Sequence, residues 1–145
     1  MTKQEMSVGF ADMHHFVPLI AAVGWERAIE YLQDGFNAVG DAIVGRQGQI
    51  RKYLGDAVLF TFDDPGQAIT AAREMAGYRR EVGAITLRFY VAVATGEVFV
   101  TQIGHSSYRV EDILGEPVNR AFGLIRQARV TEDGIALDDA SKKHS

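Results

Sequence analysis

Apolar residues recur along the chain at two spacings, one helical and one extended. From Trp25 they fall at every third or fourth position as far as Ile43, which predicts an amphipathic helix. The same spacing predicts two further helices, at 68–76 and 118–128. The remaining apolar runs are short and rich in β-branched and aromatic residues. They predict strands at 7–12, 50–53, 57–62 and 134–137, and two more inside 86–104, on either side of Thr95 and Gly96.

The predicted order is strand, helix, strand, strand, helix, strand, followed by additional elements. A hairpin between two helical crossovers in one sheet is the ferredoxin-like βαββαβ arrangement, so we expect an α/β fold. The run 57–62 is apolar on both faces except at Thr61, as in a central covered strand. The 145 residues contain no repeat or low-complexity linker, so we expect a single domain covering 1–145.

The composition excludes several classes of function. An apolar fraction of 47% and a charged fraction of 23% are typical of a globular protein. The net charge of −4 gives no electrostatic attraction to nucleic acid or to an anionic membrane. Because the chain has no cysteine, disulfides and thiolate chemistry are excluded. No apolar run has the length of a membrane span or signal peptide, so we expect a cytoplasmic location and no membrane partner.

Two aspartates stand where predicted strands end. Asp12 closes the first strand, and Asp56 lies in the turn between the second and third. If the first and third strands are neighbours, both carboxylates lie at one sheet edge and repel each other unless a cation lies between them. Mg²⁺ is often held by one or two carboxylates and substrate phosphates. The alternative is that both are turn or capping residues, which aspartate also favours. The adjacent His14 and His15 point in different directions and do not predict a two-histidine metal site.

Other polar residues, each taken alone, need no functional explanation. Lys52 precedes Asp56 by four positions, and an exposed pair of this kind contributes only about 0–1 kcal/mol. Asn119 lies one turn into the last predicted helix, with Gly123 and Arg126 on the same side. A polar helix face of this kind is usually solvated.

Four segments, taken together and in this order, resemble blocks of the class III adenylate/guanylate cyclase catalytic domain. The resemblance covers residues 7–137. It is most specific in the Lys-x-x-Gly-Asp and Asp-x-x-Gly-x-x-Val-Asn motifs. The segments are VGFADMHHF, IRKYLGDAVLFTF, ATGEVFVTQIG and EDILGEPVNRAFGLI.

The resemblance implies an adenylate cyclase that converts ATP to 3′,5′-cyclic AMP and diphosphate. It implies that Asp12 and Asp56 bind two divalent ions, Mg²⁺ or Mn²⁺, and carry catalysis, with the carbonyl of Met13 as a further ligand. Lys52 and Asp112 match the residues that read the purine. Lysine can donate to adenine N1 and aspartate can accept from the exocyclic amine, whereas guanine presents the opposite pattern.

The resemblance also implies a homodimer, because the family's active site lies between two antiparallel domains. Asn119 matches the catalytic asparagine that orients the ribose, and Phe16 is expected to contact the substrate. Lys52 and Asp56 are then expected to face two different sites and need not pair. No sensor segment is evident in the sequence, so we expect any regulator to be a separate regulatory protein or a small ligand.

Three departures from the family pattern concern the triphosphate. Gly123 stands where the family has an arginine, with Arg126 or Arg120 as candidate substitutes. His15 replaces a glycine, and Val17 replaces a threonine, in the loop that approaches the phosphates. We also expect the family's closing hairpin, with its lysine, to be missing after the segment GIAL. These departures leave open a second hypothesis, a degenerate cyclase-like domain that acts as a nucleotide-binding, dimerisation or regulatory module without appreciable catalysis.

Overall fold

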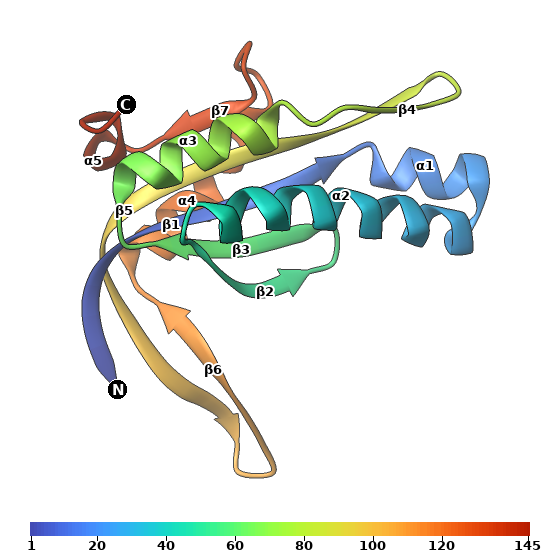
Figure 1. Ribbon diagram of the computed structural model, residues 1–145. Coiled ribbons are helices and arrows are strands. Elements are labelled where there is room, and N and C mark those ends of the chain that lie inside the picture. The colour runs from blue at the N-terminus through green and yellow to red at the C-terminus, as the bar shows by residue number, and fades with distance from the viewer.

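One seven-stranded sheet organises the computed structural model, which describes all residues from 1 to 145 (Figure 1). The strands are β1 (Thr2–His14), β2 (Gln49–Leu54), β3 (Ala57–Phe62), β4 (Arg80–Val82), β5 (Ile85–His105), β6 (Tyr108–Leu114) and β7 (Ile135–Leu137). The central path runs β2-β3-β1-β5-β4, and β6 and β7 also pair with β5. All pairs are antiparallel except that of β5 with β7.

Helices cover both faces of this sheet. They are α1 (Phe16–Val23), α2 (Trp25–Gly45), α3 (Pro65–Ala76), α4 (Glu116–Ala128) and α5 (Asp139–Lys142). The buried residues of α1, α2 and α3 join the larger core on one face, and α4 packs over a smaller core on the other. No helix combines the length and the apolar character needed to cross a membrane.

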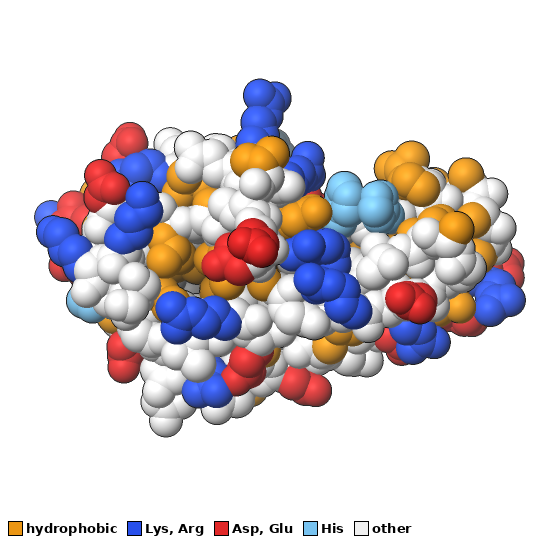
Figure 2. Space-filling model, turned by 90° about the horizontal axis from the view of Figure 1, so that it is seen from above, with side chains coloured by type: hydrophobic (Ala, Val, Ile, Leu, Met, Phe, Trp, Pro, Cys, Tyr) orange, Lys and Arg blue, Asp and Glu red, His pale blue; other side chains and the backbone are white.

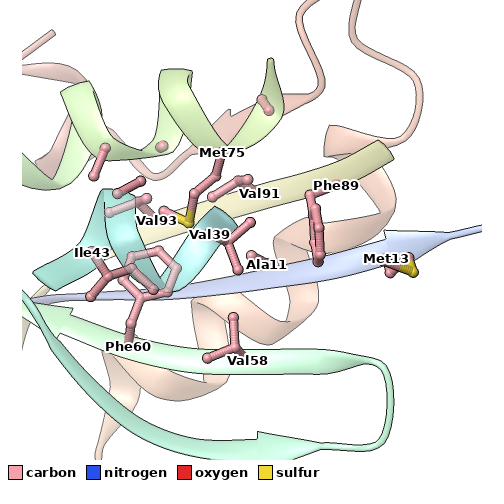
Figure 3. Packing of buried hydrophobic residues seen from close by; sticks show 14 of the residues in the cluster. Ala11, Met13, Val39, Ile43, Val58, Phe60, Met75, Phe89, Val91 and Val93 are labelled. Atoms are coloured by element: carbon pink, nitrogen blue, oxygen red, sulfur yellow. The ribbon is translucent and has the colours of Figure 1, made fainter. Parts of the chain in front are cut away.

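The pleat of β1 divides its side chains between these two cores. Val8 and Phe10 belong to the core beneath α4, whereas Ala11 and Met13 belong to the core beneath α2 and α3 (Figure 3). Because successive side chains on a strand alternate between faces, Asp12 lies on the α4 face, beyond Phe10. The end of β1 therefore carries a carboxylate towards α4.

The expected ferredoxin-like α/β fold is confirmed, with β5, β1, β3 and β2 as the core strands. The prediction of two separate runs inside 86–104 is wrong, because β5 continues through Thr95 and Gly96. A Cβ at Gly96 would lie 2.9 Å from Pro117 on α4, so this glycine permits close packing and does not form a turn. β1 extends beyond the predicted 7–12, and α1, β4, β6 and α5 are elements that the sequence patterns did not predict.

A long hairpin extends from the body of the molecule (Figure 1). It consists of the second half of β5 paired with β6, in register from Phe99 with Leu114 to His105 with Tyr108. We refer to residues 99–114 as the arm. Several of its large apolar side chains are exposed, namely Phe99, Ile103, Tyr108, Val110 and Leu114.

A buried polar network holds the C-terminal elements against β5. Asp138 accepts hydrogen bonds from the amides of Thr95 and Ser141 and from Nε of Arg120. The hydroxyl groups of Ser7, Thr95 and Ser141 continue the network at 2.7 and 2.8 Å. Since Arg120 also donates to the carbonyl of Thr95, its guanidinium is committed to holding α4 in place.

Close packing at Gly9 provides a test of the β1–β3 register. Gly9 lies opposite Phe60, and a Cβ at this position would lie 2.1 Å from the phenyl ring. We predict that Gly9→Ala lowers the free energy of unfolding by about 1–3 kcal/mol, because the ring must leave its packed position. Urea unfolding measures this change. Gly45→Ala is the control, since nothing lies within 4 Å of its Cβ, and it should be neutral or stabilising. Equal stability of Gly9→Ala and the unmutated protein would contradict the register.

Candidate active site

Asp12 and Asp56 meet at one end of the sheet because β1 and β3 are antiparallel neighbours. Asp12 is in register with Ala57, and Asp56 directly precedes Ala57 in the β2–β3 turn. The amide of Met13 donates to the carbonyl of Asp56 at 3.0 Å and fixes the turn against β1. The two carboxyl groups are close enough to share a hydrogen bond. The structure therefore brings both aspartates together, as the strand order leads us to expect.

This crowding changes the ionisation of the pair. Burial, followed by the charge of Asp12 and a hydrogen bond to its carboxyl group, raises the pKa of Asp56 to about 6. The positive charge of Arg129 acts in the opposite direction on Asp56, and its Nη2 donates to Oδ2 of Asp12 at 2.5 Å. A single guanidinium thus faces two carboxyl groups, and the pair is short of positive charge.

The donor set fits a divalent ion that arrives with a phosphate-bearing ligand. The chain has no group of three or more histidine or acidic side chains arranged to hold a metal. The candidate oxygen donors are the carboxylates of Asp12 and Asp56 and the backbone carbonyl of Met13, whose side chain is buried in the core. Mg²⁺ characteristically binds through one or two carboxylates, waters and substrate phosphates.

The start of α1 lies beside this pair and has an unusual backbone. His15 has a φ of 73°, in the left-handed region that non-glycine residues rarely occupy, and its side chain provides no cap for the helix. Its Nδ1 lies 3.1 Å from the carbonyl oxygen of Thr86. Phe16 follows as the first residue of α1, half-buried and edge-to-face with Trp25 at 6.4 Å. The positive φ gives a physical reason why glycine suits position 15.

Cationic side chains surround the two histidines. Burial, followed by the positive charges of His15, Arg129 and Arg88, lowers the pKa of His14. The rings of His14 and His15 lie 3.7 Å apart. Figure 2 shows histidine side chains next to Lys or Arg side chains on this face of the molecule. The lowered pKa makes His14 less able to carry a positive charge, so Arg129 is the cation in direct contact with the carboxylate pair.

Two clefts open on either side of Asp12, Asp56 and Arg129, which line both. The first, of about 350 Å³, lies between the β2–β3 turn and α4, and its other lining residues are Phe10, Leu54, Ala57, Phe122, Ile125 and Arg126. The second, of about 340 Å³, lies at the start of α1, and its other lining residues are Met13, His14, His15, Phe16, Val17 and Pro18. Both volumes are in the range of small-molecule sites.

Lys52 and Asp112 form an ion pair that lines neither cleft. Nζ of Lys52 lies 2.9 Å from Oδ2 of Asp112, with side-chain exposures of 39% and 18%. The neighbouring Arg51, at a bulge in β2, also reaches across to Glu111 at 3.6 Å. These contacts join β2 to the arm. Lys52 thus pairs with Asp112, and no ion pair joins it to Asp56.

The α4 residues singled out by the resemblance differ in what surrounds them. Asn119 is exposed on the first turn and lines neither cleft. Gly123 has open space around it, so no cation is supplied from that position. Arg126 lines the first cleft, whereas Arg120 is bonded to Asp138. The expectation that Arg120 could substitute for the family arginine is therefore not supported.

Sequence reasoning missed Arg129, although a signal for it was present. The residues of α4 that face the first cleft include Phe122 and Ile125. Phe122, Ile125 and Arg129 are spaced i, i+3 and i+7, so Arg129 continues the same helix face by one more turn. The side chain that follows the apolar residues on this face therefore lies over the end of β1.

The raised pKa of Asp56 makes folding stability depend on pH. In the unfolded state Asp56 loses its proton at the ordinary pKa of 3.8, whereas in the folded state it keeps the proton up to a pKa of about 6. The free energy of unfolding should therefore fall as pH rises from about 4 to 6. We predict that Asp56→Asn removes this loss and stabilises the protein by about 1 kcal/mol at pH 7, after allowance for solvent screening.

Thermal unfolding between pH 4 and pH 8, without divalent ions, measures this effect. Asp63→Asn is the control, since Asp63 is exposed, and its profile should match that of the unmutated protein. Added Mn²⁺ should stabilise the unmutated protein and have less effect on Asp56→Asn. Parallel profiles for both variants would contradict the crowding of the two carboxyl groups.

Comparisons with known proteins find adenylyl and guanylyl cyclases among the proteins similar to this chain. No family model matches the chain. An adenylate cyclase of Streptomyces coelicolor is 28% identical over 140 residues, which are 97% of this chain and 34% of that protein. The chain spans about a third of the length of the curated relatives it matches.

Solved structures show the same fold at low sequence identity. A bacterial light-regulated adenylyl cyclase has a TM-score of 0.86 at 20% identity, covering 99% of this chain and 80% of its own. The guanylyl cyclase Cya2 has a TM-score of 0.81 at 21% identity, with 99% and 79% covered. A class III adenylyl cyclase-like ATP-binding protein from Pseudomonas aeruginosa has a TM-score of 0.79 at 19% identity, with 98% and 35% covered. The chain therefore has the fold of these adenylyl and guanylyl cyclase structures, and it is distantly similar in sequence to an adenylate cyclase.

Proposed function

We propose that the chain binds ATP and, as a homodimer, converts it to 3′,5′-cyclic AMP and diphosphate. In this reaction the ribose 3′-oxygen bonds to the α-phosphorus, the bond from that phosphorus to the diphosphate oxygen breaks, and the 3′-hydroxyl proton is released. The observation that carries the proposal is the separation of two half-sites. Asp12 and Asp56 line the clefts, while Lys52 and Asp112 form a polar pair elsewhere on the same chain.

The acidic half-site is suited to the phosphate end of the nucleotide. Asp12, Asp56 and the backbone of Met13 would hold Mg²⁺ or Mn²⁺, which when bound neutralises the triphosphate and favours loss of the 3′-hydroxyl proton. The raised pKa of Asp56 supports this role, because a site that is short of positive charge gains most from a divalent ion. Phe16 lies in the second cleft, beside the start of α1, where it can contact the substrate.

The second half-site is suited to adenine. Lys52 can donate to N1 and Asp112 can accept from the exocyclic amine, and their contact of 2.9 Å keeps the two groups next to each other. Since the fold is shared by adenylyl and guanylyl cyclases, the preference for adenine rests on these two side chains alone. Asn119, exposed on α4, is assigned to the ribose.

A homodimer would bring the two half-sites together. Exposed apolar side chains lie on the arm, on the β2–β3 hairpin and on α4, where Tyr53, Leu54 and Phe122 are uncovered. Exposed apolar side chains of this size are common at protein interfaces. Antiparallel pairing with two-fold symmetry would give two equivalent sites, each with carboxylates from one copy and Lys52, Asp112 and Asn119 from the other.

A second candidate is a nucleotide-binding module without appreciable catalysis. It is favoured by Gly123, which supplies no cation, and by His15, whose side chain stands in the loop beside the second cleft. Loss of a cationic clamp on a transferring phosphoryl group costs about 10³–10⁵ in rate. Incubation with ATP and Mn²⁺ or Mg²⁺, followed by chromatography for the cyclic product, separates the candidates.

We predict that ATP is bound better and cyclised faster than GTP. Lys52→Glu combined with Asp112→Cys reverses the pattern of donor and acceptor, so the preference for ATP should fall by at least about 10-fold. Competition between the two nucleotides, read by calorimetry and by product formation, measures the change. Arg109→Gln, on the exposed end of the arm, is the control and should keep the preference for ATP. Equal affinity of the unmutated protein for ATP and GTP would disprove the assignment of Lys52 and Asp112.

We also predict that two inactive variants restore activity when mixed. Asp12→Ala removes the acidic half of each site and Asn119→Ala the ribose half. Random pairing gives about half heterodimers, each with one intact site of two, so activity should return to about a quarter of the unmutated level. A mixture that stays inactive while size analysis shows subunit exchange would contradict the shared site.

A further inference from the structure

Arg129 is the cation in direct contact with the carboxylate pair. It follows the last residue of α4, and its Nη2 donates to Oδ2 of Asp12 at 2.5 Å. The carboxylate is largely buried, with the Asp12 side chain 14% exposed, whereas the Arg129 side chain is 48% exposed. The guanidinium therefore contacts Asp12 from the solvent-exposed side.

Arg129 also lies at the boundary between the two clefts, since it lines both. The other arginines on α4 are placed differently. Arg120 is committed to Asp138, and Arg126 lines the first cleft without an ion pair to either carboxylate. A phosphate that approaches the pair from either cleft would therefore meet Arg129.

Arg129 and a divalent ion compete for the same carboxylate. A cation that binds Asp12 and Asp56 must displace the guanidinium from Oδ2 or share that oxygen against charge repulsion. Once displaced, the guanidinium needs an anionic partner near the same place. A phosphate oxygen provides one, because arginine forms two parallel hydrogen bonds with phosphate as readily as with carboxylate.

We propose that Arg129 is the phosphate-binding cation of this chain and that it occupies the carboxylate pair until metal and nucleotide arrive together. The inference rests on the proposed function, since it assigns the anion to a nucleoside triphosphate. It also gives Arg129 two opposite effects. Arg129 weakens the binding of a free divalent ion, and it strengthens the binding of the nucleotide with its ion. Metal and nucleotide binding are then coupled through one side chain.

The test measures these two effects on the full chain with Arg129→Gln. Without nucleotide, Mn²⁺ affinity, followed by the electron paramagnetic resonance signal of free Mn²⁺, should rise about 5-fold or more. With saturating Mn²⁺, the affinity for a non-hydrolysable ATP analogue, measured by calorimetry, should fall about 10-fold. Arg126→Gln removes a charge from the same cleft without breaking an ion pair, so it should change Mn²⁺ affinity much less.

Opposite changes in the two affinities support the proposal. Unchanged Mn²⁺ affinity, or a fall in both affinities, would overturn it and assign Arg129 a structural role only. Arg129→Lys is a second variant, in case Arg129→Gln does not fold. It retains the positive charge but loses the paired donors of the guanidinium. Its two affinities should lie between those of the unmutated protein and those of Arg129→Gln. Neither measurement needs turnover, so a protein that makes no cyclic product can still pass this test while the proposed catalysis fails.

Discussion

The candidate site depends on one constraint, the antiparallel pairing of β1 with β3, which forces two carboxyl groups together. With Asp12 opposite Ala57, the preceding Asp56 has to lie beside Asp12. The register is fixed far from the site by close packing such as that of Gly9 under Phe60, and it cannot slip by one residue without moving the core side chains to the other face. The packed core therefore sustains an electrostatic conflict that an unconstrained chain would avoid.

Two features of the chain reduce this repulsion. The guanidinium of Arg129 donates a hydrogen bond to Asp12, and the pKa of Asp56 is raised to about 6, so this carboxyl group loses its proton at a higher pH than an ordinary aspartate does. A divalent ion would take the place of both. The carboxylate pair is therefore suited to a ligand that brings its own cation, such as a nucleotide with a bound divalent ion.

The same hairpin that carries Asp56 also carries Lys52, and the two side chains have separate partners. The sequence motifs were sufficient to predict the helical stripes, the β2–β3 hairpin and the convergence of the two aspartates, because these follow from local periodicity and strand order. The continuity of β5 was not predictable in this way, since Thr95 and Gly96 favour a turn locally and packing against Pro117 decides otherwise. The ion pairs of Lys52 and Arg129 likewise join residues distant in sequence and depend on how the arm and α4 return to the sheet.

Asp12 and Asp56 are proposed to form a cation site to which the phosphates of a nucleotide add the remaining ligands. Anomalous diffraction from crystals grown with Mn²⁺ and a non-hydrolysable ATP analogue tests it most directly. The account predicts a manganese peak at about 2.0–2.5 Å from carboxylate oxygens of both residues, with the Arg129 guanidinium moved from Asp12 to a phosphate. Bound nucleotide with no manganese at the pair, and with Arg129 still on Asp12, would contradict it.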